Sequence, residues 1–202
     1  MSDRTTTTAG GLRDRWSGTP LGNVLVLAVV TALVLAGAWL MNRSQAQDAA
    51  ATPVDVVAGD APPPEVGTPA TDFEATTTDG RQVRLSELEG RPVWLSFVAT
   101  WCSSCRAEAP DIQDAWEQSG GEVEMVSIYL AEGAEQVSTY AERLGMTYPQ
   151  VADPQNAISG QYRVMAVPSH VFIDVDGVVR STHVGVLTPA QMQEALAQVA
   201  GR

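Results

Sequence analysis

The sequence predicts an α/β domain in which helices flank a mixed β-sheet, preceded by an N-terminal hairpin and by one transmembrane helix. A run of 21 residues without charge lies near the start of the chain. Strand-like and helix-like apolar patterns then alternate along the rest of the chain, which is typical of α/β folds. A hairpin pattern before the last helical segment adds antiparallel strands, so the sheet is expected to be mixed and covered on both faces.

The uncharged run covers residues 21–41 and is predicted to form a transmembrane anchor. Asn23 and Thr31 are its only clearly polar residues, and about 20 apolar residues in a helix suffice to cross ~30 Å of hydrocarbon. The hydrophobic part of a signal peptide usually has about 7–15 residues, which favours an uncleaved anchor. A cleaved signal peptide is the alternative, because small residues at Ser44 and Ala46 suit a peptidase.

The charges on the two sides of this run predict its orientation in the cell membrane. Arg4, Arg13 and Arg15 precede the run, whereas acidic residues soon follow Arg43. Positively charged residues favour the cytoplasmic side of a membrane. Residues 1–20 are therefore expected to form a cytoplasmic tail, and the chain after the anchor is expected to be extracytoplasmic.

Composition divides the extracytoplasmic part into a linker and a folded domain. Residues 42–66 are rich in Ala and Pro and lack apolar periodicity, so they are predicted to form an extended linker. Residues 67–202 are predicted to form the domain. The whole chain carries 24 acidic and 12 basic residues, for a net charge of −12, and such a charge repels nucleic acid, which we exclude as an expected partner.

A hairpin, a short helix and a buried strand are predicted to open the domain. Residues 73–77 and 82–85 flank a Thr-Asp-Gly turn, which is the signature of a β-hairpin. A short helix is expected next, with Ser86 as its N-cap and Gly90 as its end. The apolar run 93–99 has the length of a central strand that is covered on both faces.

Two helices and a strand are predicted to follow. Residues 103–118 form a helical segment with Pro110 inside it, and paired glycines end the segment. Residues 123–130 have the pattern of a strand. Residues 134–144 have apolar residues at the i, i+3, i+4, i+7 spacing of one helical face, and Gly145 follows as the expected end.

A short helix, a hairpin and a last helix are predicted to complete the domain. The short helix is expected over residues 154–160. Strand patterns over residues 171–173 and 178–184 are separated by an Asp-Val-Asp-Gly turn. Thr188 is the expected N-cap of the last helix, and Gln191 completes a capping box three residues later.

Cys102 and Cys105 are the only cysteines of the sequence, and they lie between a predicted strand and a predicted helix. Unpaired backbone N–H groups and the helix dipole favour a thiolate at Cys102, and Cys105 is placed to resolve a mixed disulfide. A structural zinc site lacks ligands at suitable spacing. A structural disulfide across so short a loop would constrain the unfolded chain little. A redox-active disulfide, with no metal or other cofactor, explains the placement best.

The residues around this pair resemble the active site of thioredoxins. Residues 97–105, Phe-Val-Ala-Thr-Trp-Cys-Ser-Ser-Cys, are similar to the thioredoxin motif, and Val167-Pro168 is similar to the cis-proline loop of that family. Pro110 matches the family's helix kink. The resemblance spans about residues 67–200, and it implies a thioredoxin-like fold with a cis peptide bond before Pro168; a trans proline in a turn is the alternative.

Further features resemble the TlpA/ResA branch, which includes cytochrome c maturation thioredoxins. They are the membrane anchor, the N-terminal hairpin and an insertion around residues 123–149. Glu108 stands where this branch carries an acidic residue that tunes the cysteines; a solvated surface charge is the alternative. Trp101 flanks the nucleophile, and the resemblance implies that its ring shields the disulfide and contacts a partner; packing into the core is the alternative.

Two positions depart from the thioredoxin pattern. Ser96 stands where thioredoxin carries a buried Asp that helps to move protons for the inner cysteine. His170, two residues after Pro168, stands at a position that is usually apolar in the family. We hypothesise that His170 approaches Ser96 and Cys105 across adjacent strands and relays protons near neutral pH. An ordinary buried histidine is the alternative.

The expected activity is thiol:disulfide exchange with exported proteins. We favour a reductase that acts on partners such as apocytochrome c and is recycled by a membrane thiol reductase. The sequence leaves the direction of electron flow open, and an oxidase that donates disulfides and is recycled by a membrane oxidase is the alternative. A peroxiredoxin, which would carry Thr or Ser in place of Ala99, and a copper metallochaperone, which would have three residues between its cysteines, are less well matched.

Overall fold

The computed structural model describes residues 20–48 and 64–201 of the chain. The chain divides into two units, one built on helix α1 (Pro20–Asp48) and the other holding the folded domain. Residues 1–19 of the predicted cytoplasmic tail and residues 49–63 of the predicted linker lie outside the described residues.

Helix α1 is apolar along the part whose side chains are described, residues 24–39. Its valines and leucines are exposed, and the hydroxyl of Thr31 donates a hydrogen bond to the Leu27 carbonyl oxygen at 2.8 Å. Within the part of the chain that the structure describes, no helix is long and apolar enough to cross a membrane.

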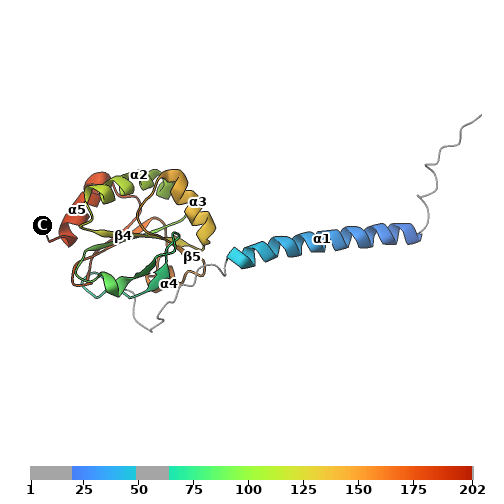
Figure 1. Cartoon of the computed structure of the whole chain (residues 1–202), viewed down its shortest axis with the longest axis horizontal. Helices are drawn as coiled ribbons and strands as arrows, with labels where there is room; N and C mark the ends of the chain where they lie inside the picture. Colours follow the sequence, from blue (N-terminus) through green and yellow to red (C-terminus); the bar gives the residue numbers. More distant parts are fainter. Residues whose placement is uncertain (1–19, 49–63, 202) are drawn as a thin grey trace, which may run out of the picture. The chain divides into compact units, whose positions relative to one another are not determined.

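The folded domain is organised around a five-stranded sheet (Figure 1). In spatial order its strands are β5 (Gln150–Asp153), β4 (Glu124–Leu130), β3 (Val93–Val98), β6 (Ser169–Ile173) and β7 (Val179–Val184). Strand β4 runs parallel to β3 and β5, whereas β6 runs antiparallel to β3 and β7. The predicted mixed sheet is therefore confirmed.

Helical segments cover both faces of this sheet (Figure 1). One face packs against α2 (Ser103–Gln118), α3 (Ala134–Leu144) and α5 (Pro189–Val199). The other face packs against α4 (Ala157–Gln161), the 3-10 helix η1 (Leu85–Leu88) and the hairpin of β1 (Glu74–Thr76) and β2 (Gln82–Arg84). Because side chains alternate along a strand, Trp94 and Ser96 of β3 face the α2 side, whereas Phe97 faces the α4 side.

Most of the predicted elements are confirmed within a few residues. Pro110 lies inside α2, as predicted. The N-terminal hairpin forms with Ala75 opposite Val83. The capping box of α5 is also confirmed, because the hydroxyl of Thr188 accepts a hydrogen bond from the Gln191 backbone N–H while the Gln191 side chain accepts one from the Thr188 backbone N–H.

The predicted role of Ser86 as a helix N-cap is wrong. Ser86 lies inside η1, whose N-cap is Arg84 and has no side-chain cap. The backbone N–H and the hydroxyl of Ser86 instead donate hydrogen bonds to the Asp72 carboxylate, at 2.9 and 2.8 Å. The serine therefore ties η1 to the segment that precedes the hairpin.

Strand β5 is missing from the sequence-based prediction, and the short helix after it begins later than predicted. All four residues of β5 are buried, so the strand has no alternating pattern, and it is too short for an apolar run to identify it. Its last residue, Asp153, accepts hydrogen bonds from the backbone N–H groups of Ala157 at 2.6 Å and Ser159 at 2.9 Å. This carboxylate satisfies the first turn of α4, which therefore begins at Ala157 rather than at residue 154.

Candidate active site

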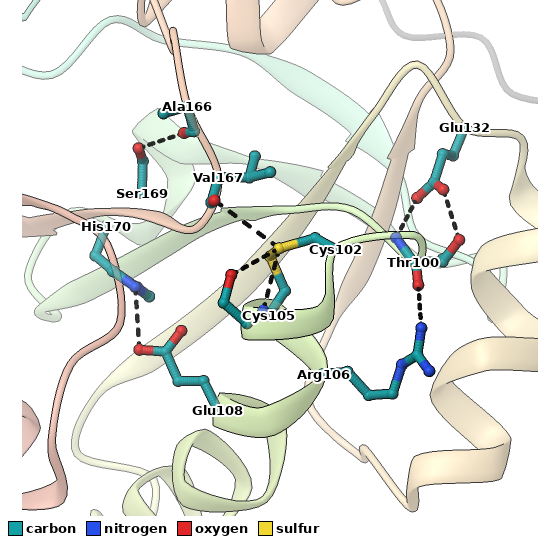
Figure 2. The surroundings of a disulfide bond; sticks show 11 residues. Thr100, Cys102, Cys105, Arg106, Glu108, Glu132, Ala166, Val167, Ser169 and His170 are labelled. Carbon is teal, nitrogen blue, oxygen red and sulfur yellow. Dashed lines mark hydrogen bonds and ion pairs between the residues drawn. A yellow bond between two sulfur atoms is a disulfide. The ribbon is translucent and has the colours of Figure 1, made fainter.

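The two cysteines lie at the amino end of α2, just after the carboxyl end of β3 (Figure 2). A disulfide links Cys102 and Cys105. Cys102 is the N-cap of α2, and its Sγ accepts a hydrogen bond from the Cys105 backbone N–H at 3.1 Å. The Ser104 hydroxyl lies 3.2 Å from the same sulfur. Because these groups and the helix dipole also favour a thiolate, Cys102 has the surroundings of a nucleophile.

The loop before β6 lies against this sulfur. The Val167 carbonyl oxygen is 3.8 Å from Cys102 Sγ, and the peptide bond between Val167 and Pro168 is cis, as predicted. Cys102 and Cys105 are both buried. The structure thus brings the cysteine pair and the cis-proline loop together at one end of the sheet.

Apolar side chains stand exposed around this end of the sheet. Trp101 is 69% exposed, so it does not fill the core. Met165, which precedes the cis-proline loop, is 93% exposed, and Val184, which pairs with Ser169, is also exposed. A groove of about 290 Å³ opens between the residues of this loop, β6 and β7. Exposed apolar surface of this kind is typical of sites that bind other proteins.

Glu132 fixes the backbone that leads into the cysteine pair, and the sequence-based prediction missed it. Its side chain is buried, and the carboxylate accepts hydrogen bonds from the backbone N–H and the hydroxyl of Thr100, at 2.8 and 2.6 Å. The Gln136 amide donates a further hydrogen bond at 2.8 Å. The available signal was topological: Glu132 follows β4 and Thr100 follows β3, and neighbouring parallel strands end at the same edge.

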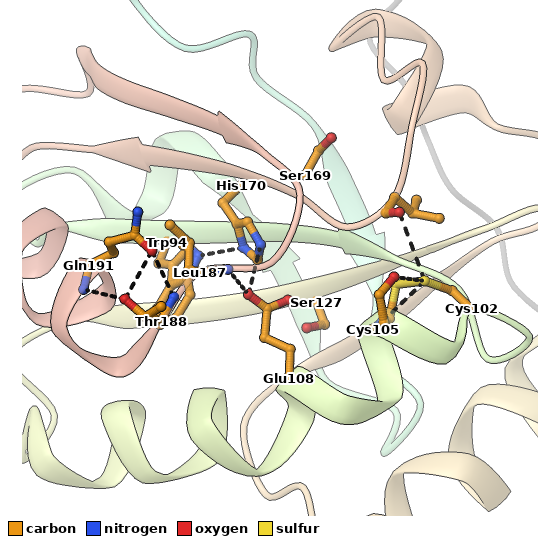
Figure 3. A network of polar contacts seen from close by, with 12 residues as sticks. Trp94, Cys102, Cys105, Glu108, Ser127, Ser169, His170, Leu187, Thr188 and Gln191 are labelled. Atoms are coloured by element: carbon orange, nitrogen blue, oxygen red, sulfur yellow. Dashed lines mark hydrogen bonds and ion pairs between the residues drawn. A yellow bond between two sulfur atoms is a disulfide. The ribbon is translucent and has the colours of Figure 1, made fainter.

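A second buried network lies one helical turn beyond Cys105 (Figure 3). The side chains of Glu108 and His170 are both 0% exposed, and His170 Nε2 lies 3.3 Å from Glu108 Oε1. This is an electrostatic contact without the alignment of a full hydrogen bond, since His170 Nε2 has no hydrogen-bond partner among the described residues. Glu108 Oε1 also accepts a hydrogen bond from the Leu187 backbone N–H at 2.6 Å. His170 Nδ1 accepts one from the Trp94 indole N–H at 3.3 Å.

The structure places Ser96 and His170 opposite each other on β3 and β6, as hypothesised. The polar contacts of the imidazole, however, are with Trp94 and Glu108, and within the described residues no hydrogen bond joins it to a cysteine. The Ser96 hydroxyl is buried and has no hydrogen-bond partner among those residues. The alternative of a solvated surface charge at Glu108 is excluded by its burial.

Tyr148, which feels the charge of Glu108 in this network, stays protonated. Burial raises the pKa of Tyr148 to about 12, and the negative charge of Glu108 contributes to the rise. Burial likewise raises the pKa of Tyr129. Among the described side chains, no group of three or more His, Cys, Asp and Glu residues is arranged to hold a metal ion.

A disulfide at the first turn of a helix, a cis-proline loop against it and a mixed sheet in the order β5-β4-β3-β6-β7 define a thioredoxin-like thiol:disulfide oxidoreductase. The family comparison agrees with this class. The chain belongs to the AhpC/TSA family, whose model matches residues 66–182.

Named relatives specify the branch. The chain is 31% identical over 137 residues to the thiol-disulfide oxidoreductase ResA of Geobacillus thermodenitrificans. This match covers 66% of this chain and 78% of that protein. It is 32% identical over 133 residues to the thioredoxin-like protein YneN of Bacillus subtilis, with coverages of 64% and 78%. A thiol:disulfide interchange protein of the thioredoxin family from Chlorobium tepidum has a similar structure, with a TM-score of 0.59, 26% identity and coverages of 71% and 100%. The TlpA/ResA-like resemblance and the oxidoreductase class are thereby confirmed.

Proposed function

We propose that the domain reduces disulfides in exported proteins, with Cys102 as nucleophile and Cys105 as resolving residue. The Cys102 thiolate attacks a substrate disulfide, and one substrate sulfur leaves as a thiolate that takes up a proton. Cys105 then loses its proton and attacks Cys102 Sγ of the mixed disulfide, which releases the second substrate sulfur and closes the disulfide of the protein. Two electrons pass to the substrate, and a membrane thiol reductase returns them.

The buried carboxylate of Glu108 is the observation that carries this direction of electron flow. Glu108 stands three residues after Cys105, and residues three apart share one face of a helix. Its Oε2 is buried and has no hydrogen-bond partner among the described residues. A neighbouring negative charge disfavours a second one, so Glu108 limits the stability of the cysteine thiolates. Strong oxidants depend on a stabilised reduced form, and a reductase is therefore favoured over an oxidase.

The exposed apolar surface supports a protein as the substrate. Trp101 precedes Cys102 in the chain, Met165 precedes the cis-proline loop, and Val184 pairs with Ser169 after that loop; all three are exposed. The backbone before a cis proline can pair with an extended segment of a substrate. An apocytochrome c that holds its haem-binding cysteines as a disulfide is one substrate of the proposed chemical class. Trp101 supplies a flat apolar face beside the sulfur that the substrate must reach.

We infer that residues 21–41 anchor the domain to the cell membrane, on its extracytoplasmic side. The run is free of charge over 21 residues, and the described valines and leucines of α1 are exposed rather than packed in a core. The one hydroxyl in the described part, that of Thr31, is satisfied within the helix by the Leu27 carbonyl. Such internal satisfaction is what hydrocarbon surroundings require of a polar group.

The reduction potential of the protein, measured by equilibration with glutathione, tests the direction. We expect a value near about −270 mV, which is typical of reducing thioredoxins, and a value near about −120 mV would instead establish an oxidase. Cys102→Ser and Cys105→Ser variants serve as controls. Both should lose disulfide reduction, and only the variant that keeps Cys102 should accumulate a mixed disulfide with the substrate.

A further inference from the structure

The contacts of His170 fix which of its two ring nitrogens carries a proton. A neutral imidazole has one donor and one acceptor nitrogen, and a tryptophan indole N–H can only donate. The Trp94 indole nitrogen lies 3.3 Å from His170 Nδ1 and donates to it, so Nδ1 has no proton. The single proton of the ring is therefore on Nε2, which faces Glu108 Oε1 at 3.3 Å (Figure 3).

The same contact opposes a second proton on the ring. Protonation of Nδ1 would set an N–H group against the Trp94 N–H and would break the hydrogen bond between them. Trp94 is fully buried and stacks on Phe172, with ring centroids 5.1 Å apart, so it cannot turn away without disturbing the core. Packing of Trp94, as well as its hydrogen bond, therefore keeps Nδ1 of His170 without a proton.

Among the charged and titratable groups that the structure describes in contact with His170, Glu108 is the acidic one. Glu108 faces it from α2, and the ring of His183 faces it from β7, with centroids 6.4 Å apart. Ser96 lies opposite it on β3. Tyr148, whose pKa is raised to about 12 chiefly by burial, lies near enough to Glu108 to be affected by its charge. Among these groups only Glu108 would favour an imidazolium, and its Oε1 already accepts the Leu187 N–H.

We propose that His170 is a positioning residue, locked by Trp94 as a neutral donor, and that it holds Glu108 so that the free Oε2 accepts the proton of Cys105. The inference rests on the proposed exchange at the cysteine pair and deepens it. It also changes the role hypothesised from the sequence: His170 keeps its proton throughout, and Glu108 is the group that gains and loses one.

The proton balance of the resolving step follows from this arrangement. The Cys105 thiol gives its proton to the Glu108 carboxylate, and the resulting thiolate attacks Cys102 Sγ of the mixed disulfide. The bond between Cys102 and the substrate sulfur breaks, and the substrate sulfur leaves as a thiolate. The leaving thiolate takes a proton from solvent, and Glu108 returns its own proton when the cysteines are next reduced. The Leu187 N–H stays hydrogen-bonded to Oε1 of the carboxylate, and the Nε2–H of His170 stays in electrostatic contact with it.

The protonation of His170 can be measured directly, because the chain has only two histidines. In full-length protein labelled with ¹⁵N-histidine, we expect His170 to show a protonated Nε2 and an unprotonated Nδ1 at neutral pH. The half-buried His183 serves as an internal reference. Trp94→Phe removes the donor but keeps an aromatic ring, and in that variant the ring proton should no longer be confined to Nε2. A proton on Nδ1 of His170 in the unaltered protein at neutral pH would overturn the proposal.

The functional part of the proposal is tested by reaction of the reduced protein with Ellman's reagent. The first thiolate of the reagent is released by Cys102, and the second is released when Cys105 resolves the mixed disulfide. We expect His170→Phe to slow the second release at least about tenfold and to change the first less than twofold. His170→Gln, which keeps an N–H near the position of Nε2, should restore most of the second rate.

These outcomes separate this inference from the proposed function. If His170→Phe slows both releases equally, or if His170→Gln fails to restore the second rate while its circular dichroism matches that of the unaltered protein, the positioning role is wrong. If the unaltered protein releases both thiolates but fails to reduce protein disulfides, the proposed function is wrong and the role of His170 in the resolving step is untouched.

Discussion

The buried carboxylate of Glu132 is hydrogen-bonded to Thr100, the residue that precedes the exposed Trp101. The carboxylate holds the Thr100 N–H and hydroxyl, and the Gln136 amide donates to both Glu132 Oε1 and Thr100 Oγ1. Arg106 adds a contact of 3.4 Å to the Thr100 carbonyl oxygen. The position of the exposed tryptophan therefore depends on one carboxylate that lies outside the cysteine motif.

Glu132→Ala is expected to impair reduction of protein disulfides more than reduction of small ones. The change removes an acceptor from three donors, so the segment before Cys102 loses its fixed position. Because small misplacements cost large factors in rate, we expect about a tenfold lower rate with insulin as substrate and less than about a threefold change with Ellman's reagent. Glu135→Ala, at an exposed position of the same region, is the matched control. Equal losses with both reagents would contradict this role.

Asp174 provides a test of pH dependence far from the cysteines. Its burial opposes ionisation, but hydrogen bonds from the Val178 and Asp176 backbone N–H groups and the ion pair with Arg180 outweigh burial and lower its pKa. The unfolded chain has the ordinary value of about 3.9. The stabilising effect is therefore complete above that pH and is lost as the pH falls through the lower folded value.

Asp174→Asn should therefore lower the free energy of unfolding at neutral pH but not at strongly acid pH. We expect the free energy of unfolding in urea to fall by about 1 kcal/mol at pH 7, since the half-exposed Arg180 partner is screened by solvent. The difference between the two proteins should shrink below pH ~4 and vanish near pH ~2. Asp176→Asn, at an exposed position of the same turn, should show no comparable pH dependence. A difference that persists at pH ~2 would mean that packing, rather than charge, is responsible.

The residues of the site differ in how far the sequence could predict them. Cys102, Cys105 and Pro168 were predicted because short motifs specify them. The pairing of His170 with Ser96 was predicted from strand alignment, but the contact with Trp94 was not, because it depends on which face of β3 each side chain occupies. A backbone donor from a distant loop, such as the Leu187 N–H, leaves no signal in the sequence.

The N-terminus of α5 is connected to the active site through the loop before it. Leu187 donates its N–H to Glu108, and the next residue, Thr188, begins the capping box of α5. We expect Thr188→Ala to lower the free energy of unfolding by about 1 kcal/mol, because the first turn loses its side-chain cap. Thr188→Ser keeps the hydroxyl and should retain most of the stability. If serine proves as destabilising as alanine, the methyl group rather than the cap is important.

Elements with long periodic patterns were predicted well, and elements defined by single tertiary contacts were not. Helices α2, α3 and α5 have apolar faces that their sequences display, and the apolar run of β3 indicated a central strand. Strand β5 forms because it pairs with β4, a contact between segments far apart in the sequence. The position of η1 likewise depends on the hydrogen bonds between Ser86 and Asp72, which no local propensity encodes.

Charge and apolarity are segregated along the chain in a way that suits an anchored domain. The uncharged run of residues 21–41 precedes a domain that carries most of the 24 acidic residues. An acidic domain is repelled by anionic lipid headgroups, so without a hydrophobic anchor it would not stay at a membrane. The proposed return of electrons by a membrane reductase requires the domain to remain there.

Leu33→Arg tests the anchor, because Leu33 lies near the middle of the uncharged run and is exposed on α1. An arginine at the centre of a membrane helix costs about 2.5–3.5 kcal/mol in insertion, so we expect most of this variant to be extracted by alkaline carbonate. The unaltered protein and Leu33→Ala should stay in the membrane fraction.

The predicted orientation has its own test in intact cells. After reduction, the cysteine pair of the protein should react with a membrane-impermeant maleimide added outside the cells. An intact mass that lacks the first 46 residues would show instead that the run is a cleaved signal peptide, and equal extraction of all three proteins would contradict the anchor.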